Sequence, residues 1–258
     1  MEPSYFDVHT HLNLDAFKGR EDEEIKESLE AGVWMINAGA DLETSLKAVE
    51  LADSYESGVY ATAGIHPGGK YGSEFNESDL MDLILSEKVV AVGECGLDYF
   101  HITDEEGVRK QREPFLRQID MANRAKKPLM LHLRNGPGGN AYRDAISMLK
   151  EARFGGNAHF FSGSRDDAKE LLSLGFTLSF TGVVTFTDSY DDLVRFPPLD
   201  MVMSETDAPY VAPLSVRGKE NRPVYVKEIA QRIAEIRPEE DEMVLSALVE
   251  NARRVFGV

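Results

Sequence analysis

The sequence is poor in cysteine, and this limits the kinds of metal site that it can build. Cys95 is the only cysteine among the 258 residues, so the chain cannot form an internal disulfide. A thiolate zinc site of the zinc-finger kind is excluded for the same reason. Any metal ion must therefore be bound by histidines and carboxylates.

Basic residues are also scarce. The 28 lysines and arginines are outnumbered by 45 acidic residues, which gives a net charge of −17. This balance argues against a broad basic surface that grips duplex DNA. It does not exclude an anionic substrate, because bound divalent cations can reverse the sign of the field at a site.

The sequence has no long hydrophobic run and no readable targeting segment. No apolar stretch approaches the length of a membrane span, and the N-terminal residues MEPSYFDVHT lack a basic segment followed by an apolar one. We therefore expect a cytoplasmic protein without membrane association. No linker rich in Pro, Gly or Ser divides the chain, and its length predicts one domain over residues 1–258.

Short β-branched or apolar runs alternate with longer amphipathic stretches about eight times along the chain. The expected strands cover residues 5–11, 33–39, 59–67, 89–98, 128–134, 157–163, 176–182 and 201–209. Helices are expected within residues 42–55, 77–88, 112–127, 141–152 and 165–175. We expect Gly175 to end the last of these helices and Pro114 to lie in a first turn or at a kink. The alternation favours an α/β fold closed into a (β/α)₈ barrel, with an open doubly wound sheet as the alternative.

Residues capable of metal chemistry fall at the carboxyl ends of the expected strands. They are His9, His11, Glu94, His132, His159 and Asp207. Each one has an ordinary structural explanation, such as a hydrogen-bonded core histidine for His132 or a turn for Asp207. Their shared position favours a joint site, because the strand ends of a parallel barrel converge on one mouth. Such a set can hold two divalent metal ions with open positions for water and substrate.

Three loops rich in Gly or Pro follow the ends of expected strands, where a barrel carries its functional loops. They cover residues 66–72, 134–140 and 212–223.

A series of motifs resembles the TatD-type metal-dependent deoxyribonucleases, a family within the amidohydrolase-like barrels. The motifs are DVHTH, AGIHP, GECGLDY, the spacing of Gln111, Phe115 and Gln118, HLR, HFFSG, SETDAPY and RGKENRP. The resemblance covers nearly the whole chain and implies a TIM barrel of the metal-dependent hydrolase type. The sequence departs from the family pattern in three places. Gly68 stands where a second histidine is often found, the NGPGGN loop is lengthened, and HFFSG replaces the usual HCFSG.

The resemblance also implies a division of the ligands between two metal ions. His9, His11, Glu94 and Asp207 would bind one ion. Glu94, His132 and His159 would bind the other, so that Glu94 bridges the pair. The two cofactor ions would be Mg²⁺, Mn²⁺ or Zn²⁺, since imidazole suits zinc whereas carboxylates and phosphate suit magnesium or manganese.

The expected function is metal-dependent hydrolysis of phosphodiester bonds at DNA ends by a metal-activated water. Asp207 would orient the water and accept its proton, with Glu94 as the second catalytic carboxylate. Arg134 would contact a phosphate or form an ordinary ion pair, and His66 would contact the scissile phosphate or cap the third strand.

The expected substrate is single-stranded or frayed DNA, and no obligate protein partner is predicted. Aromatic side chains beside the ligand motifs are candidates for base stacking or for the core, namely Tyr99, Phe160, Phe161 and Tyr210. One alternative function is a small-molecule hydrolase of amide, lactone or phosphotriester bonds. The other is a metal-binding scaffold without turnover.

Overall fold

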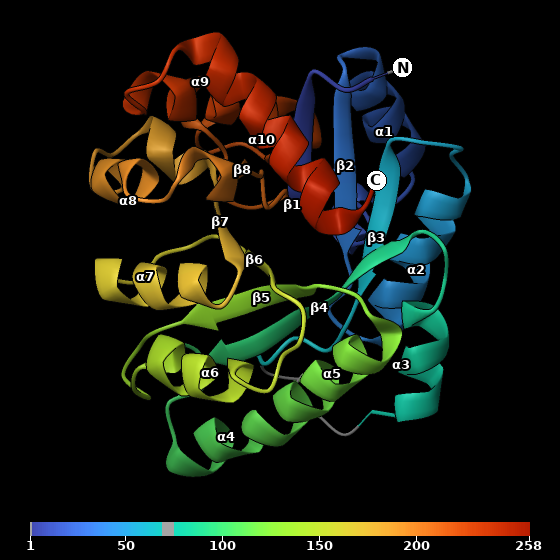
Figure 1. Cartoon of the computed structure of the whole chain (residues 1–258). Helices are drawn as coiled ribbons and strands as arrows, with labels where there is room; N and C mark the ends of the chain where they lie inside the picture. Colours follow the sequence, from blue (N-terminus) through green and yellow to red (C-terminus); the bar gives the residue numbers. More distant parts are fainter. Residues whose placement is uncertain (1, 69–74) are drawn as a thin grey trace.

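Eight parallel strands form one sheet in which each strand pairs with the next along the chain (Figure 1). The computed structural model describes residues 2–68 and 75–258. The strands are β1 (Tyr5–Thr10), β2 (Val33–Ala38), β3 (Val59–Ala63), β4 (Val89–Asp98), β5 (Leu129–Arg134), β6 (Gly156–Ala158), β7 (Phe176–Phe180) and β8 (Val202–Ser204). The expected α/β barrel is therefore confirmed.

The barrel is joined between its last and first strands by backbone hydrogen bonds just beyond the end of β8. The Asp207 N–H donates to the His9 carbonyl and the His11 N–H donates to the Ala208 carbonyl, each over 2.8 Å. The buried Asp7 carboxylate reinforces this seam by accepting the backbone N–H of Thr206 over 2.8 Å. An open doubly wound sheet is excluded, because its strands would not follow the order of the sequence.

Helices cover the outside of the barrel. They are α1 (Glu21–Glu30), α2 (Leu42–Asp53), α3 (Glu77–Ile84), α4 (Glu105–Lys110), α5 (Arg112–Ala125), α6 (Ala141–Leu149), α7 (Arg165–Ser173), α8 (Asp191–Arg195), α9 (Val226–Ile236) and α10 (Asp241–Phe256). The five expected helices correspond to α2, α3, α5, α6 and α7. Pro114 lies in the first turn of α5, where its missing N–H removes no helical hydrogen bond. Gly175 follows α7 with a φ of +83°, a conformation that suits glycine.

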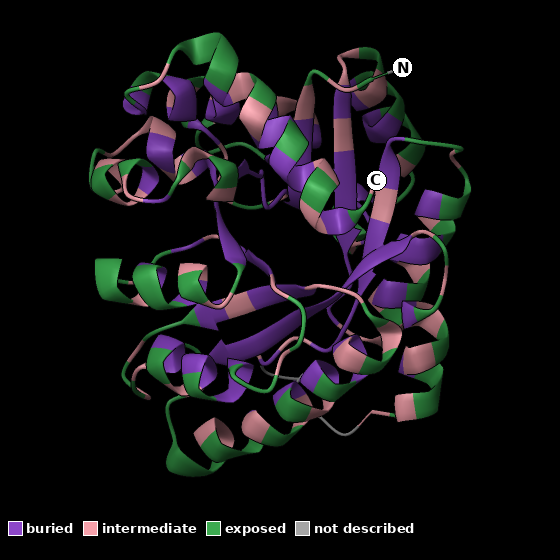
Figure 2. Cartoon of the chain, viewed as in Figure 1, coloured by how far each residue is buried: buried purple, intermediate pink, exposed green. Residues whose placement is uncertain are grey.

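The buried residues lie along the strands and on the inner faces of the helices, whereas the outer faces are exposed (Figure 2). One buried cluster joins Phe6, Val8 and Met130 of the strands to Phe256 of α10, which packs against β1 and β8. His132 follows Met130 by two positions in β5, so both side chains lie on the same face of the strand. The interior thus changes from apolar to ionisable toward the carboxyl ends. Within residues 2–68 and 75–258, no helix combines the length and the apolar character that a membrane crossing requires.

Candidate metal centre

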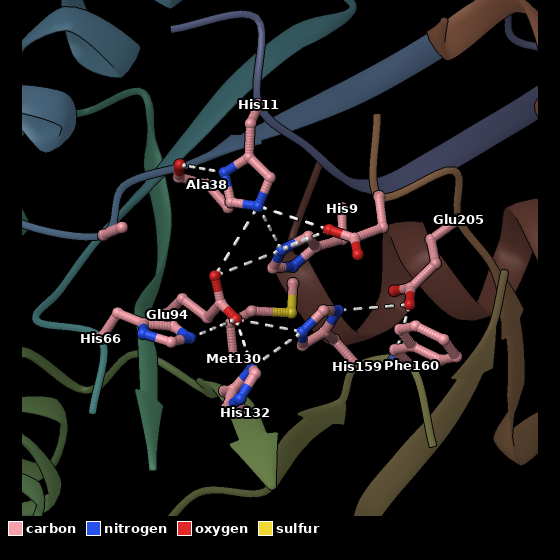
Figure 3. Close-up of polar contacts among 12 residues, drawn as sticks. His9, His11, Ala38, His66, Glu94, Met130, His132, His159, Phe160 and Glu205 are labelled. Atoms are coloured by element: carbon pink, nitrogen blue, oxygen red, sulfur yellow. Dashed lines mark hydrogen bonds and ion pairs between the residues drawn. The ribbon is translucent and has the colours of Figure 1, made fainter. Parts of the chain in front are cut away.

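Four candidate ligand atoms converge from β1, β4 and the segments that follow β1 and β8 (Figure 3). The Nε2 atoms of His9 and His11 are 3.1 Å apart. Glu94 Oε2 lies 3.6 and 3.7 Å from these two nitrogens, and Asp207 Oδ1 lies 3.8 and 3.4 Å from them. Ligands held tetrahedrally at 2.0–2.2 Å from a cation are about 3.4 Å apart, so these atoms are spaced as ligands of one metal ion.

The other oxygen of Glu94 faces a second set of ligands. Glu94 Oε1 lies 2.7 Å from His132 Nδ1 and 3.0 Å from His159 Nε2, and these two nitrogens are 3.4 Å apart. The two carboxylate oxygens are thus divided between the two sets, as a bridging ligand requires. The structure brings all six predicted ligands together, although they are up to 198 positions apart in the chain, from His9 to Asp207.

The outward nitrogens of three of the histidines indicate which protonation state each ring adopts. His11 Nδ1 lies 3.0 Å from the Ala38 carbonyl, His132 Nε2 lies 3.1 Å from Asp98 Oδ2, and His159 Nδ1 lies 3.3 Å from Glu205 Oε1. Oxygens of these kinds can only accept, so the outward nitrogens of His11 and His132 carry a proton, whereas His159 Nδ1 and Glu205 form an ion-pair contact without hydrogen-bond geometry. In the neutral form of these rings, the nitrogen that faces Glu94 presents a lone pair, which is the form that binds a metal ion.

His66 has the opposite arrangement. Its Nδ1 accepts the backbone N–H of Gly68 over 2.9 Å, which places the proton of the neutral ring on Nε2. That Nε2 lies 3.5 Å from Glu94 Oε1, so the distances alone would group His66 with Glu94 and His132 as potential metal ligands. Because the inward nitrogen bears the proton, His66 is suited to donate a hydrogen bond rather than to bind a metal ion.

The electrostatics of the cluster favour cations. Burial by itself would raise the pKa of Glu94, but His66 and His159 hold that pKa well below its usual range. The pKa of Asp207 is likewise lowered, against its burial, by the hydrogen bond to His11 and by His159. Burial lowers the pKa of His9 and, together with His132, lowers the pKa of His66 to about 3. Ionised carboxylates bind divalent metals, but the neighbouring carboxylates also raise the pKa of His11, His132 and His159 against the effect of burial, so metal binding competes with protonation of these rings.

Two buried carboxylates that support the ligands were missed by the sequence reasoning. Asp98 accepts from His132, and Glu205 accepts the backbone N–H of Phe160 over 2.5 Å and the Ser179 hydroxyl over 2.7 Å. Both are fully buried. Their signal in the sequence was their spacing, since Asp98 follows Glu94 by four positions and Glu205 precedes Asp207 by two. Even spacing along a strand places side chains on one face.

The ligands open into a cavity of about 740 Å³. Arg134 lines it, with its guanidinium 4.1 Å from the centre of the Phe100 ring. Within the described residues, Arg134 forms no ion pair with a carboxylate, so the alternative explanation given for it is not observed. Phe160 and Tyr210 also line the cavity, as does Tyr190, which the sequence analysis did not single out.

Two of the aromatic candidates for base stacking belong to the core instead. Tyr99 and Phe161 are 1% and 0% exposed. The Tyr99 hydroxyl lies 3.0 Å from Asp144, and the Phe161 ring packs edge-on against Tyr142. Aromatic residues next to a strand end therefore divide into core and cavity according to the path of the backbone.

The three predicted loops lie differently with respect to the cavity. Residues 69–72 of the first lie outside the described residues. The second is folded back by a bridge between Gly136 and Gly139 and is held to β4 through the Gly138 N–H and the Tyr99 carbonyl. In the third, Asn221 donates to the carbonyls of Thr206 and Tyr210 over 2.8 and 2.6 Å, which fixes the cavity wall beyond Asp207.

Comparisons with known proteins agree with this geometry. The sequence profile of the TatD-related DNase family matches residues 6–257. The chain is 35% identical over 262 residues to the uncharacterized metal-dependent hydrolase YabD of Bacillus subtilis, covering 98% of this chain and 99% of that protein. It is 37% identical over 205 residues to the uncharacterized metal-dependent hydrolase YcfH of Escherichia coli, covering 78% and 74% of the two chains. The crystal structure of YjjV, a TatD homologue from Escherichia coli, superposes with a TM-score of 0.88 and 27% identity over the whole of both chains.

The barrel and its cluster of buried ligands define a metal-dependent hydrolase of the amidohydrolase superfamily. Within that class, the chain belongs to the TatD-related DNase family. The resemblance stated from the sequence motifs is therefore confirmed, as is the TIM barrel that it implied.

Proposed function

We propose that this protein hydrolyses phosphodiester bonds at the ends of single-stranded or frayed DNA, using two divalent metal ions. The observation that carries the proposal is the division of the two Glu94 oxygens between two ligand sets. A carboxylate shared between two cations reduces their repulsion and sets their separation. Such a pair can serve both the attacking and the departing oxygen of a phosphodiester, which are on opposite sides of phosphorus.

Bound cations would supply Lewis acidity and lower the pKa of a water molecule. In this scheme His9, His11, Glu94 and Asp207 hold one ion, and Glu94, His132 and His159 hold the other. Asp207 would also act as the general base, because Oδ1 belongs to the proposed ligand set and Oδ2 is left to accept a proton from water.

His66 and Arg134 would bind the substrate. His66 presents an N–H toward the space beside Glu94, where it can donate to an oxygen of the scissile phosphate. Arg134 offers the planar guanidinium that binds a phosphate through two parallel hydrogen bonds. The Phe100 ring beneath it limits its motion and so reduces the entropy lost on binding.

The size and charge of the site favour a chain end over long duplex DNA. A cavity of about 740 Å³ has the volume of a small-molecule site. The net charge of −17 disfavours a long track of phosphate contacts outside it. Exposed Tyr210 and the partly buried Phe160 offer faces on which a terminal base can stack.

A matrix of metals and substrates tests the proposal. The purified protein is assayed with Mg²⁺, Mn²⁺ and Zn²⁺ on single-stranded DNA labelled at either end, the matching duplex, bis(p-nitrophenyl) phosphate, and amide, lactone and phosphotriester substrates. Asp207→Asn should lower kcat on DNA by about 10²–10⁴-fold. Asp53→Asn, on the exposed surface of α2, is the control and should retain activity.

Equal rates on single strands and duplexes would contradict the preference for frayed ends. Cleavage of the amide, lactone or phosphotriester alone would replace the nuclease with the small-molecule hydrolase. Metal binding without turnover on any substrate would leave the scaffold as the function.

A further inference from the structure

His101 lies at the rim of the cavity, outside the set of proposed metal ligands. Its side chain is 57% exposed, yet the ring is held in place through Nδ1, which lies 2.7 Å from Asp98 Oδ2. The other oxygen of Asp98 accepts the backbone N–H groups of Phe100 and His101 over 2.9 and 2.8 Å. A fully buried carboxylate thus fixes an exposed imidazole by its inner nitrogen, and Nε2 on the opposite side of the ring is left for a ligand.

Arg134 belongs to the same wall of the cavity. It is the register partner of Asp98 between β4 and β5, so the two backbones lie side by side. Its guanidinium covers the Phe100 ring, and that ring meets the His101 ring edge-on with 5.1 Å between the centres. Phe100 therefore lies between a permanent positive charge and a fixed imidazole, and both of these groups face the cavity.

One layer of side chains separates this wall, formed by Phe100, His101 and Arg134, from Glu94. The His132 ring and the Asp98 carboxylate separate His101 from Glu94, with 2.7 Å between His132 Nδ1 and Glu94 Oε1 and 3.1 Å between His132 Nε2 and Asp98 Oδ2. A phosphate bound beside Glu94 would lie on the inner side of His132. A group that contacts His101 must therefore be a different part of the substrate.

We propose that His101 and Arg134 bind a second phosphate of the substrate, adjacent to the one that is hydrolysed, and that His101 determines specificity for ends carrying it. In its doubly protonated form, a ring held in this way would donate Nδ1–H to Asp98 and Nε2–H to a phosphate oxygen, while Arg134 would donate two further hydrogen bonds. The inference rests on the proposed function and deepens it, because it selects a phosphorylated oligonucleotide end as the preferred substrate.

The test compares substrates that differ only in the second phosphate. These are the dinucleotide dTpdT, its 5′-phosphorylated and 3′-phosphorylated forms, and bis(p-nitrophenyl) phosphate. In His101→Asn the amide replaces Nδ1 as the donor to Asp98 and removes Nε2. The variant should raise KM about tenfold for one of the phosphorylated dinucleotides, with kcat unchanged, and should leave dTpdT and the chromogenic substrate unaffected.

Arg134→Ala should raise KM more for the same phosphorylated dinucleotide than for dTpdT, because Arg134 also belongs to the proposed substrate site. Its matched control is Arg217→Ala, since the Arg217 guanidinium also covers an aromatic ring, at 3.9 Å from the centre of Phe186, but does not line the cavity. An equal loss on all four substrates in His101→Asn would overturn the inference, because it would mean that His101 acts on His132 through Asp98. The absence of any loss would overturn it as well.

The outcome for the proposed function is separate. If the wild-type protein cleaves none of these phosphodiesters, the proposed function fails, and binding of the three dinucleotides to the Ca²⁺-loaded protein is then measured by calorimetry. His101→Asn should abolish a preference for a terminal phosphate. A wild-type protein without that preference, or a variant that keeps it, would overturn the inference.

Discussion

Replacing Glu205 should weaken metal binding at the second ligand set without removing any ligand. Glu205 Oε1 lies 3.3 Å from His159 Nδ1 and also accepts the Phe160 N–H, while Oε2 accepts the Ser179 hydroxyl. It thereby holds the imidazole with Nε2 directed at Glu94 and increases the basicity of that nitrogen. Glu205→Gln keeps an oxygen that can face His159 and removes the charge, whereas Glu205→Ala removes the support altogether.

Loss of an outer carboxylate of this kind reduces metal affinity by about 10–100-fold, which corresponds to about 1.4–2.7 kcal/mol. We expect Glu205→Gln near the lower end of this range and Glu205→Ala near the upper end. Isothermal titration calorimetry of the metal-free protein with Mn²⁺ or Zn²⁺ resolves the effect. The loss of affinity should affect only one of the two metal-binding events, because His9, His11 and Asp207 do not depend on Glu205 for their outward contacts.

Glu250→Gln is the control, since Glu250 is exposed on α10 and bonds to Ser246. It should bind both ions as the wild-type protein does. Unchanged affinity in Glu205→Ala would refute the reasoning, and so would an equal loss for both ions. The first result would mean that His159 is held without the carboxylate, and the second that the variant disturbs the whole cluster.

Further predictions follow from the same cluster. In metal-free protein, the lowered pKa values of Glu94 and Asp207 stabilise the fold fully above about pH 5, and this contribution disappears as the pH falls through their folded pKa values. Urea unfolding should therefore show a steeper loss of stability with acid in wild type than in Glu94→Gln. Metal at 100 times its Kd should raise Tm by about 5–10 °C over the stripped protein in calorimetry, and an unchanged Tm would argue against a site in the native state. Gly64→Ala would place a Cβ 2.5 Å from the Gly93 backbone beside Glu94. This variant should destabilise the fold by about 1–3 kcal/mol and weaken metal binding. The control is Gly218→Ala, where nothing lies within 4 Å of the added Cβ, and it should leave metal binding intact.

The barrel was predictable because its signals are local. Short apolar or β-branched runs mark the strands, amphipathic stretches mark α2 and α5, and Gly175 and Pro114 mark helix boundaries. Helices α1, α9 and α10 were not among the expected ones, and α10 is needed to cover Phe6 and Val8. The convergence of the proposed ligands was predictable in turn, because parallel strands of a barrel bring their carboxyl ends to one mouth wherever they lie in the chain.

The functions of individual side chains depended on contacts that the sequence does not encode by spacing. Gly68 selects the tautomer of His66 through one backbone N–H, and Phe100 rather than a carboxylate covers Arg134. Tyr99 and Tyr210 each directly follow an expected strand, yet Tyr99 is buried and Tyr210 is 55% exposed. Such differences arise from distances of a few ångströms between residues that are far apart in the chain.

By itself, the sequence determined the order of the strands and helices and the kinds of side chain at the strand ends. Only the tertiary structure decided which oxygen of Glu94 faces which histidines, and which buried carboxylates support them. The physical reason is that periodicity is a local property, which indicates only the side of a strand on which a residue lies. Hydrogen bonds and metal ligation respond to the position of single atoms once the barrel has closed.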